Sequence, residues 1–157
     1  MFTKIVWATD GSANADEALP IARSLAEAAG GRILAVHCTE VIVGRSASGL
    51  PVPADEEERQ EKIRGQVAEL RAAGLKATLL VVVGASSETA RLLAKTAGRV
   101  DADVIVTGTR GHSLVTGAIV GSVTQRLLHL APCPVLTVPP AQRPTRRRMP
   151  ETGAVGG

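Results

Sequence analysis

The 157-residue sequence has almost no aromatic residues: Phe2 and Trp7 are the only two, and tyrosine is absent. Hydrophobic residues still make up 45% of the chain, so a globular core must be built from Val, Leu, Ile and Ala. The shortage of aromatics also removes the side chains on which single-stranded nucleic acids stack. A nucleic-acid partner is therefore disfavoured.

Cysteine is equally scarce, and the separation of Cys38 and Cys133 fits neither a metal-ligand pair nor a redox pair. We expect two buried, reduced thiols. The sequence contains no run of 18 apolar residues, which disfavours a membrane-spanning helix, and residues 1–10 lack the apolar stretch of a secretory signal. These absences predict a cytoplasmic protein with no membrane partner.

The formal net charge of +3 arises entirely at the C-terminal end. From Arg143 onward there are four arginines and one glutamate, which leaves 14 basic and 14 acidic residues in the rest of the chain. This balance implies no basic face of the kind that binds nucleic acids. Residues 141–157 are rich in Pro, Arg and Gly, and we expect a basic, disordered tail behind a domain of residues 1–140.

Five apolar runs are continuous rather than alternating, which is typical of strands covered on both faces; they span residues 4–9, 32–38, 77–83, 104–107 and 134–138. Helical patterns separate them, at about residues 13–29, 55–74, 86–98 and 121–130. Pro20 either kinks the first helix or marks a later start, and Ser86 or Ser87 is expected to cap the third. The order predicts a single-domain α/β fold, an open five-stranded parallel sheet with helices on both faces.

The segment with the strongest chemical signal is Gly108-Thr109-Arg110-Gly111, followed nine residues later by Gly121-Ser122-Val123-Thr124. It joins the fourth strand to the fourth helix, where glycines let backbone amides approach a phosphate and the helix N-terminus adds free donors. A glycine-rich loop capped by Ser122 is the simpler alternative. No lysine follows Gly121, so the segment is not a Walker A loop. It also does not follow the first strand, as a dinucleotide fingerprint would.

The glycine segment and three of the predicted strands resemble those of a known family. "GTRGHSLVTGAIVGS" fits the Gly-x2-Gly-x9-Gly-Ser/Thr pattern of the ATP-binding branch of the universal stress proteins. "IVWATDGS", "VDADVIVTGTRG" and "CPVLTVP" are similar to that family's first strand, fourth strand and last strand. The resemblance covers about residues 3–139 and implies a Rossmann-like, adenine-nucleotide-binding fold.

The resemblance also assigns roles to individual residues. It implies that Asp10, with Ala8 and Thr9 beside it, contacts the ribose, and that Val36 contacts the adenine. It implies a loop over the ribose and phosphates made by Gly108, Arg110 and Gly111. It implies a phosphate cradle made by Gly121, Ser122, Val123 and Thr124. Thr107 departs from the family pattern, because an apolar residue is expected there.

The resemblance implies ATP as the ligand, with Mg²⁺ held mainly by phosphate oxygens, and a homodimer formed through residues 134–138. We therefore expect a nucleotide-dependent stress-response switch with slow hydrolysis at most, since the motif offers no obvious general base. A slow ATPase or phosphotransferase, a cyclic-AMP-binding protein and a nucleotide-free interaction module remain as alternatives.

Several polar residues have simpler interpretations. Asp10 alone would be read as a turn residue or helix cap. His37, His112 and His129 are scattered and are interpreted as surface or hydrogen-bonded histidines. The acidic run at residues 56–61 is interpreted as a solvated helix start.

Overall fold

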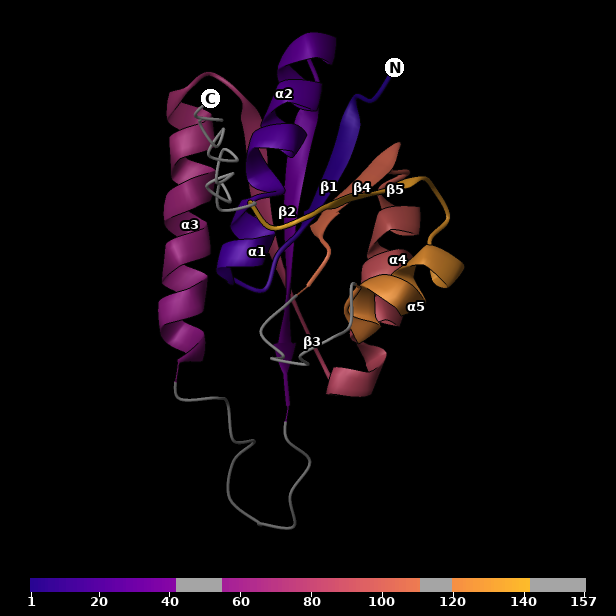
Figure 1. The fold of residues 1–157 in the computed structure, drawn as a ribbon. Coiled ribbons are helices and arrows are strands. Elements are labelled where there is room, and N and C mark those ends of the chain that lie inside the picture. The colour runs from indigo at the N-terminus through magenta and orange to yellow at the C-terminus, as the bar shows by residue number, and fades with distance from the viewer. Residues whose placement is uncertain (42–54, 111–119, 142–157) are drawn as a thin grey trace, which may run out of the picture.

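The computed structural model describes residues 1–41, 55–110 and 120–141. Strands and helices alternate along the chain as predicted (Figure 1). The strands are β1 (Lys4–Ala8), β2 (Arg32–Glu40), β3 (Lys76–Gly84), β4 (Val104–Gly108) and β5 (Val135–Val138). The helices are α1 (Ala13–Asp16), α2 (Leu19–Ala29), α3 (Glu56–Ala72), α4 (Thr89–Arg99) and α5 (Ser122–Leu130).

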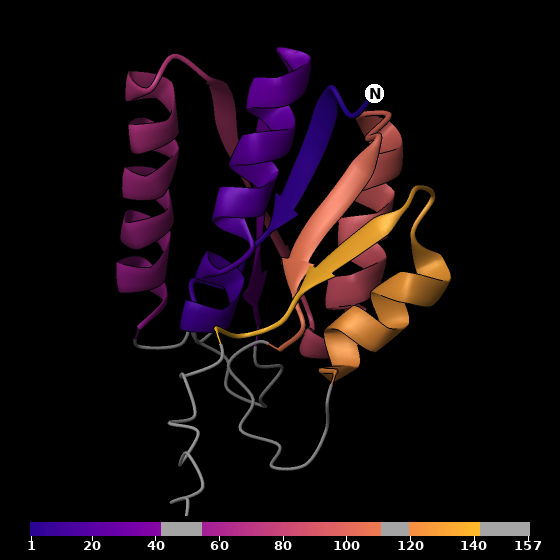
Figure 2. The ribbon, with the colours of Figure 1, turned by 45° about the horizontal axis from the view of Figure 1, so that its top comes forward.

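The five strands form one parallel sheet of order β3-β2-β1-β4-β5, which confirms the predicted fold class. The first three helices cover one face and α4 and α5 cover the other (Figure 2). Each face has its own aliphatic core: Ile5 and Trp7 belong to the α2–α3 side, and Val6 and Ala8 belong to the α4–α5 side. Burial on both faces explains why the strands read as continuous apolar runs.

Trp7 is the one large aromatic side chain of the core. It is fully buried, and its indole nitrogen donates a hydrogen bond to the carbonyl of Ala15 at 3.1 Å. A buried indole needs such an acceptor. The bond also fixes α1 against the end of β1.

The predicted first helix is two helices. Ser12 caps α1 by accepting a hydrogen bond from the amide of Ala15. Pro20 stands at the start of α2, where its missing N–H costs nothing. Of the two sequence-based alternatives, Pro20 therefore marks a later helix start.

The prediction that a serine caps the third helix was wrong. A 3₁₀ turn at Ser86–Glu88 precedes α4, and Glu88 occupies the cap position without a side-chain cap bond. The Ser86 hydroxyl instead donates a hydrogen bond to the carboxylate of Glu40 at 3.1 Å. This bond joins the end of β2 to the start of the α4 segment.

Cys38 and Cys133 are both unpaired and half-buried, so the expectation of buried thiols holds only in part. Burial raises the pKa of each thiol, and the hydroxyl of Thr89 partly opposes this effect at Cys38. Across the described ranges no helix has the length and apolarity to cross a membrane. Residues 142–157 of the predicted tail lie outside the described residues.

Gly31 connects α2 to β2 and packs against the backbone of Thr3, just before β1. A Cβ atom there would lie 2.6 Å from the carbonyl oxygen of Thr3, a backbone atom that cannot move aside. We expect Gly31→Ala to lower the free energy of unfolding by about 1–3 kcal/mol. Gly65, within α3, has nothing within 4 Å of that position, so Gly65→Ala should raise it by about 0.5–1 kcal/mol. Urea unfolding measures the stability of both variants. Equal stabilities of Gly31→Ala and Gly65→Ala would contradict the close contact at Gly31.

Candidate functional site

A cavity of about 460 Å³ lies at the carboxyl ends of β1, β2 and β4. β1 is the first strand of the chain and lies in the middle of the sheet, so the strand order reverses between β1 and β4. In open α/β sheets ligands bind at this reversal. The cavity lining includes the predicted site residues Ala8, Thr9, Asp10, Val36, Gly108, Arg110, Gly121, Ser122, Val123 and Thr124. The remaining one, Gly111, lies outside the described residues.

The turn after β1 is held by its own side chains. The amide of Ser12 donates to Asp10 Oδ1 at 3.0 Å, and the amide of Gly11 donates to Thr9 Oγ1 at 3.1 Å. Gly11 has a positive φ of 76°, which favours glycine. Asp10 is thus a turn residue that also lines the cavity, whereas the helix-capping role belongs to Ser12.

Close packing against α1 requires glycine at position 108, which the sequence alone did not indicate. A Cβ atom there would lie 2.5 Å from the carbonyl oxygen of Asn14, so only glycine lets β4 approach α1 this closely. Its own carbonyl accepts the buried hydroxyl of Thr124 at 3.1 Å. The hydroxyl proton of Thr124 is therefore used to tie α5 to β4.

The N-terminus of α5 faces the same cavity. Gly121 is the cap residue, and its amide donates to the carbonyl of Thr109 at 2.7 Å. The expectation that this amide holds a phosphate needs correction, because it is already used. The amides of Ser122 and Val123 are in the first turn, where no acceptor exists within the helix. Ser122 does not cap α5, so the simpler interpretation of this residue was wrong.

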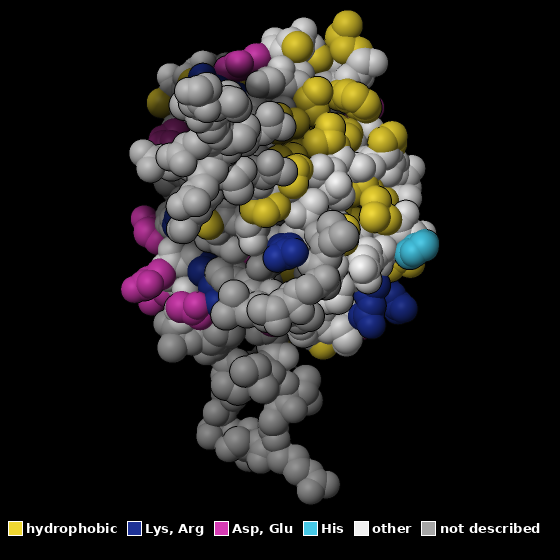
Figure 3. All heavy atoms as spheres, in the orientation of Figure 1, with side chains coloured by type: hydrophobic (Ala, Val, Ile, Leu, Met, Phe, Trp, Pro, Cys, Tyr) yellow, Lys and Arg dark blue, Asp and Glu magenta, His cyan; other side chains and the backbone are white. Residues whose placement is uncertain are grey.

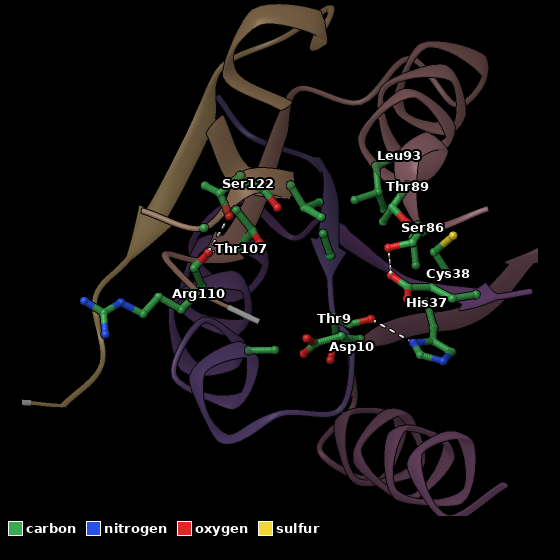
Figure 4. A pocket seen from close by; sticks show the side chains of 18 of the residues that line it. Thr9, Asp10, His37, Cys38, Ser86, Thr89, Leu93, Thr107, Arg110 and Ser122 are labelled. Carbon is green, nitrogen blue, oxygen red and sulfur yellow. Dashed lines mark hydrogen bonds between the residues drawn. The ribbon is translucent and has the colours of Figure 1, made fainter. Parts of the chain in front are cut away.

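A buried polar network beneath the cavity was missed. His37 Nδ1 donates to the carbonyl of Thr9 at 3.0 Å, as Figure 4 shows, and Nε2 lies 2.8 Å from Glu56 Oε1. The same carboxylate oxygen accepts hydrogen bonds from the hydroxyl of Thr39 at 2.7 Å and from the side-chain amide of Gln60 at 2.8 Å. His37 is 1% exposed and Glu56 is 3% exposed.

The network corrects one expectation and confirms another. Glu56, the first residue of the acidic run, is buried and hydrogen-bonded through Oε1 rather than solvated. His37 is hydrogen-bonded as expected, and His129 is on the surface. His112 lies outside the described residues. The sequence held one signal for this network, namely a histidine within an apolar strand, because a buried imidazole requires polar partners.

Hydrogen bonding favours the charged form of Glu56. Burial by itself would raise the pKa of this carboxyl group, but hydrogen bonds from Gln60, Thr39 and His37 outweigh burial and hold the pKa below its ordinary value. Because the carbonyl of Thr9 can only accept, His37 Nδ1 carries a proton.

Two arginines border the cavity with different geometry. The guanidinium of Arg110 points away from the other labelled side chains in Figure 4. Arg59 of α3, which sequence reasoning did not select, also lines the cavity and pairs with Asp55. Its buried Nε has no hydrogen-bond acceptor among the described residues. Within the same part of the chain, no group of three or more His, Cys, Asp or Glu residues is placed to hold a metal ion.

These features define a doubly wound α/β domain with a ligand-sized cavity where the strand order reverses. The chain belongs to the universal stress protein family, whose family model matches residues 1–139.

Individual relatives agree with this assignment. The universal stress protein in the QAH/OAS sulfhydrylase 3′ region of Thermus aquaticus is 35% identical, over 88% of this chain and 99% of its own length. The structure of a universal stress protein in complex with cAMP is 24% identical, with a TM-score of 0.66 over 89% of this chain and 98% of that one. A complex of the Archaeoglobus fulgidus universal stress protein with dAMP is also 24% identical, with a TM-score of 0.63 over 87% and 97%.

The Glu56 carboxylate should be required for stability at neutral pH. We expect Glu56→Gln to lower the free energy of unfolding by about 2–4 kcal/mol, because His37 loses its charged partner. The folded-state pKa of Glu56 lies below its ordinary value, so this stabilisation is present above the ordinary glutamate range and is lost as the pH falls through the lowered pKa. The difference between wild type and variant should therefore shrink in acid.

Denaturant unfolding between pH 7 and pH 3 measures this effect. Glu57→Gln is the matched control, since Glu57 is the exposed neighbour on the same helical turn. It should change stability by less than about 0.5 kcal/mol. Equal losses in the two variants would show that the buried pair does not stabilise the fold.

Proposed function

We propose that this protein binds an adenine nucleotide, ATP in the first instance, in the cavity above β1 and β4, and acts as a nucleotide-dependent stress-response switch. The observation that carries the proposal is the meeting of the Asp10 turn and the first-turn amides of α5 in one 460 Å³ cavity. Ligand sites are typically about 300–1,000 Å³. Two family members of the same fold have been solved with cAMP and with dAMP, which supports an adenine ligand here.

The phosphate end of the ligand fits the N-terminus of α5. The amides of Ser122 and Val123 are donors without intrahelical acceptors, and the helix dipole is positive at this end. Arg59, which pairs with Asp55, also lines this cavity, and its buried Nε has no acceptor among the described residues. Mg²⁺, if it accompanies ATP, would be held mainly by phosphate oxygens.

The adenosine end fits the turn after β1 and the adjoining strand. Asp10 is at the cavity edge with Oδ1 fixed by the amide of Ser12, which suits a carboxylate that orients a ribose hydroxyl. Val36 and Leu93 supply apolar surface for the base. Thr107 is half-buried at a position where the family pattern suggests an apolar residue, so the packing around adenine differs there.

The chemistry of the cavity favours a switch over a fast enzyme. His37 and Glu56 line the cavity, but their hydrogen bonds commit them to each other and to Thr9. A general base must be free to accept a proton from the attacking group. Hydrolysis, where it occurs, should therefore be slow.

Gly121→Val tests the phosphate site. A branched side chain at the cap of α5 would obstruct the approach of a phosphate to the neighbouring amides. We expect ATP affinity, measured by calorimetry on the purified and folded protein, to fall at least about tenfold, since each lost charge-assisted bond costs about 1.5–3 kcal/mol. Gly65→Ala, remote from the cavity in α3, should leave ATP affinity unchanged.

The same titration with cAMP and dAMP separates the adenine ligands. Unchanged ATP affinity in a folded Gly121→Val protein would remove the phosphate assignment. If cAMP binds more tightly than ATP, cAMP rather than ATP is the ligand of this cavity.

We also propose that two copies pair through β5. This strand lies at the edge of the sheet, and hydrophobic side chains gather on the side of the molecule where β4 and β5 lie (Figure 3). The carbonyls of Pro134 and Val138 accept from the amides of Ile105 in β4 and Thr109 just after it. Because strand residues alternate, the backbone of Val135 and Thr137 points to the open edge. Prolines on both sides limit the pairing to a short segment.

Thr137→Pro removes one outward backbone donor and should shift the protein from dimer to monomer. Light scattering should give about twice the monomer mass for wild type and a mass near that of the monomer for the variant at the same concentration. Thr137→Val keeps the amide and serves as the control. A monomeric wild type at high concentration would refute the dimer, and a stable Thr137→Pro dimer would place the interface elsewhere.

A further inference from the structure

A second cavity, of about 260 Å³, lies at the opposite end of the sheet from the nucleotide cavity. It is built at the amino ends of β1, β2 and β3, near the N-terminus in Figure 1. Because the two cavities are at opposite ends of the same parallel strands, no lining residue is shared between them.

The rim of this cavity carries three cations in a row. Lys4 pairs in register with Arg32, and Arg32 pairs in register with Lys76. Register partners in a parallel sheet project from the same face, and neighbouring strands are about 4.8 Å apart. Like charges so arranged repel each other.

The described residues compensate little of this charge. Lys4 is 3.8 Å from the carboxylate of Asp101, which is itself largely exposed. Arg32 and Lys76 are exposed and form no ion pair with any described residue. Asp101 and Asp103 both lie close to Lys4, so Arg32 and Lys76 are the two rim cations without an acidic partner among the described residues.

The accessible aliphatic surface of the cavity, its floor, comes from the half-buried Leu34 and Val100, whereas Val6 is fully buried. Two residues beyond each cation, and therefore on the same face, are Val6, Leu34 and Thr78. Val100, which follows the last residue of α4, closes one side. The last carbonyls of α4 accept hydrogen bonds from the amides of residues 100–102, so they do not compete for the cations.

The cavity is open along β3. Thr78 and Leu80 project toward the α4 face of this edge strand, and both are exposed. A ligand can thus enter from the sheet edge, lie on the aliphatic floor and place one end among the cations.

We propose that this cavity binds an aliphatic carboxylate: a short hydrocarbon chain on Leu34 and Val100, with its carboxylate between Arg32 and Lys76. Arginine and lysine donate charge-assisted hydrogen bonds to a carboxylate, and the chain removes the apolar floor from water. A simple phosphate would use only the cations. The small volume of the cavity fits a short chain better than a bulky ligand.

Octanoate is the probe, titrated by calorimetry into the full-length protein and followed by amide chemical shifts. Perturbed shifts should cluster at Arg32, Thr78 and Val100. Affinity should rise about three- to fourfold for each methylene from butanoate to octanoate, following the transfer free energy of a buried methylene. Binding should weaken as salt increases, because the rim charges are exposed.

Variants separate the rim from the floor. Arg32→Gln and Lys76→Gln should each weaken octanoate binding about two- to fivefold, the range for exposed ion pairs. Thr78→Val, which enlarges the apolar floor without adding bulk, should strengthen it. Arg91→Gln is the control, since Arg91 is exposed on α4 outside this lining.

The proposal is overturned by any of three results. The first is equal affinity for butanoate and octanoate, or for inorganic phosphate and octanoate, which would leave a simple anion patch. The second is undiminished binding in the doubly substituted Arg32→Gln, Lys76→Gln protein. The third is shift changes confined to Asp10 and Ser122, which would place the ligand in the nucleotide cavity.

Discussion

The arrangement of the cavity at the carboxyl ends of the strands depends on one buried chain of hydrogen bonds, from the carbonyl of Thr9 through His37 to Glu56. It joins the end of β1, the middle of β2 and the first residue of α3, three segments that no short loop holds together. Lys62 of α3 adds a second tie by donating to the carbonyl of Gly11 at 2.8 Å. A turn held from both sides can present Asp10 at a fixed position before any ligand arrives, and such preorganisation reduces the cost of binding.

A second constraint sets the other wall of the cavity. The absence of a Cβ at Gly108 lets the end of β4 contact the backbone of Asn14, and the hydroxyl of Thr124 then fixes α5 to the same residue. The N-terminus of α5 consequently faces the turn after β1 across the point where the strand order reverses. Gly108 and Thr124 thus build the frame of the cavity, and the amides of Ser122 and Val123 have no acceptor within the helix.

The ends of the sheet differ in chemistry because parallel strands place like ends together. The carboxyl ends gather turns, glycines and a helix N-terminus around a polar cavity. The amino ends gather Lys4, Arg32 and Lys76 over an aliphatic floor. One sheet therefore offers two chemically different cavities that share no lining residue.

The sequence by itself predicted the five strands, their parallel arrangement and the glycine segment that borders the cavity. These features follow from local patterns: apolar runs of strand length, helical spacing between them, and glycines at fixed separations. Boundaries were less exact, as at Ser86, whose hydroxyl bonds Glu40 instead of capping a helix.

Only the tertiary structure decided how the polar residues are used. His37 and Glu56 are 19 positions apart, and the pattern of an acidic helix start gives no hint that its first carboxylate is buried. The sequence pattern also suggests that the amide of Gly121 could donate to a phosphate. In the structure this amide donates to the carbonyl of Thr109 at 2.7 Å instead. Local pattern determines which elements form, whereas hydrogen-bond partners distant in sequence are fixed only when the sheet and helices pack.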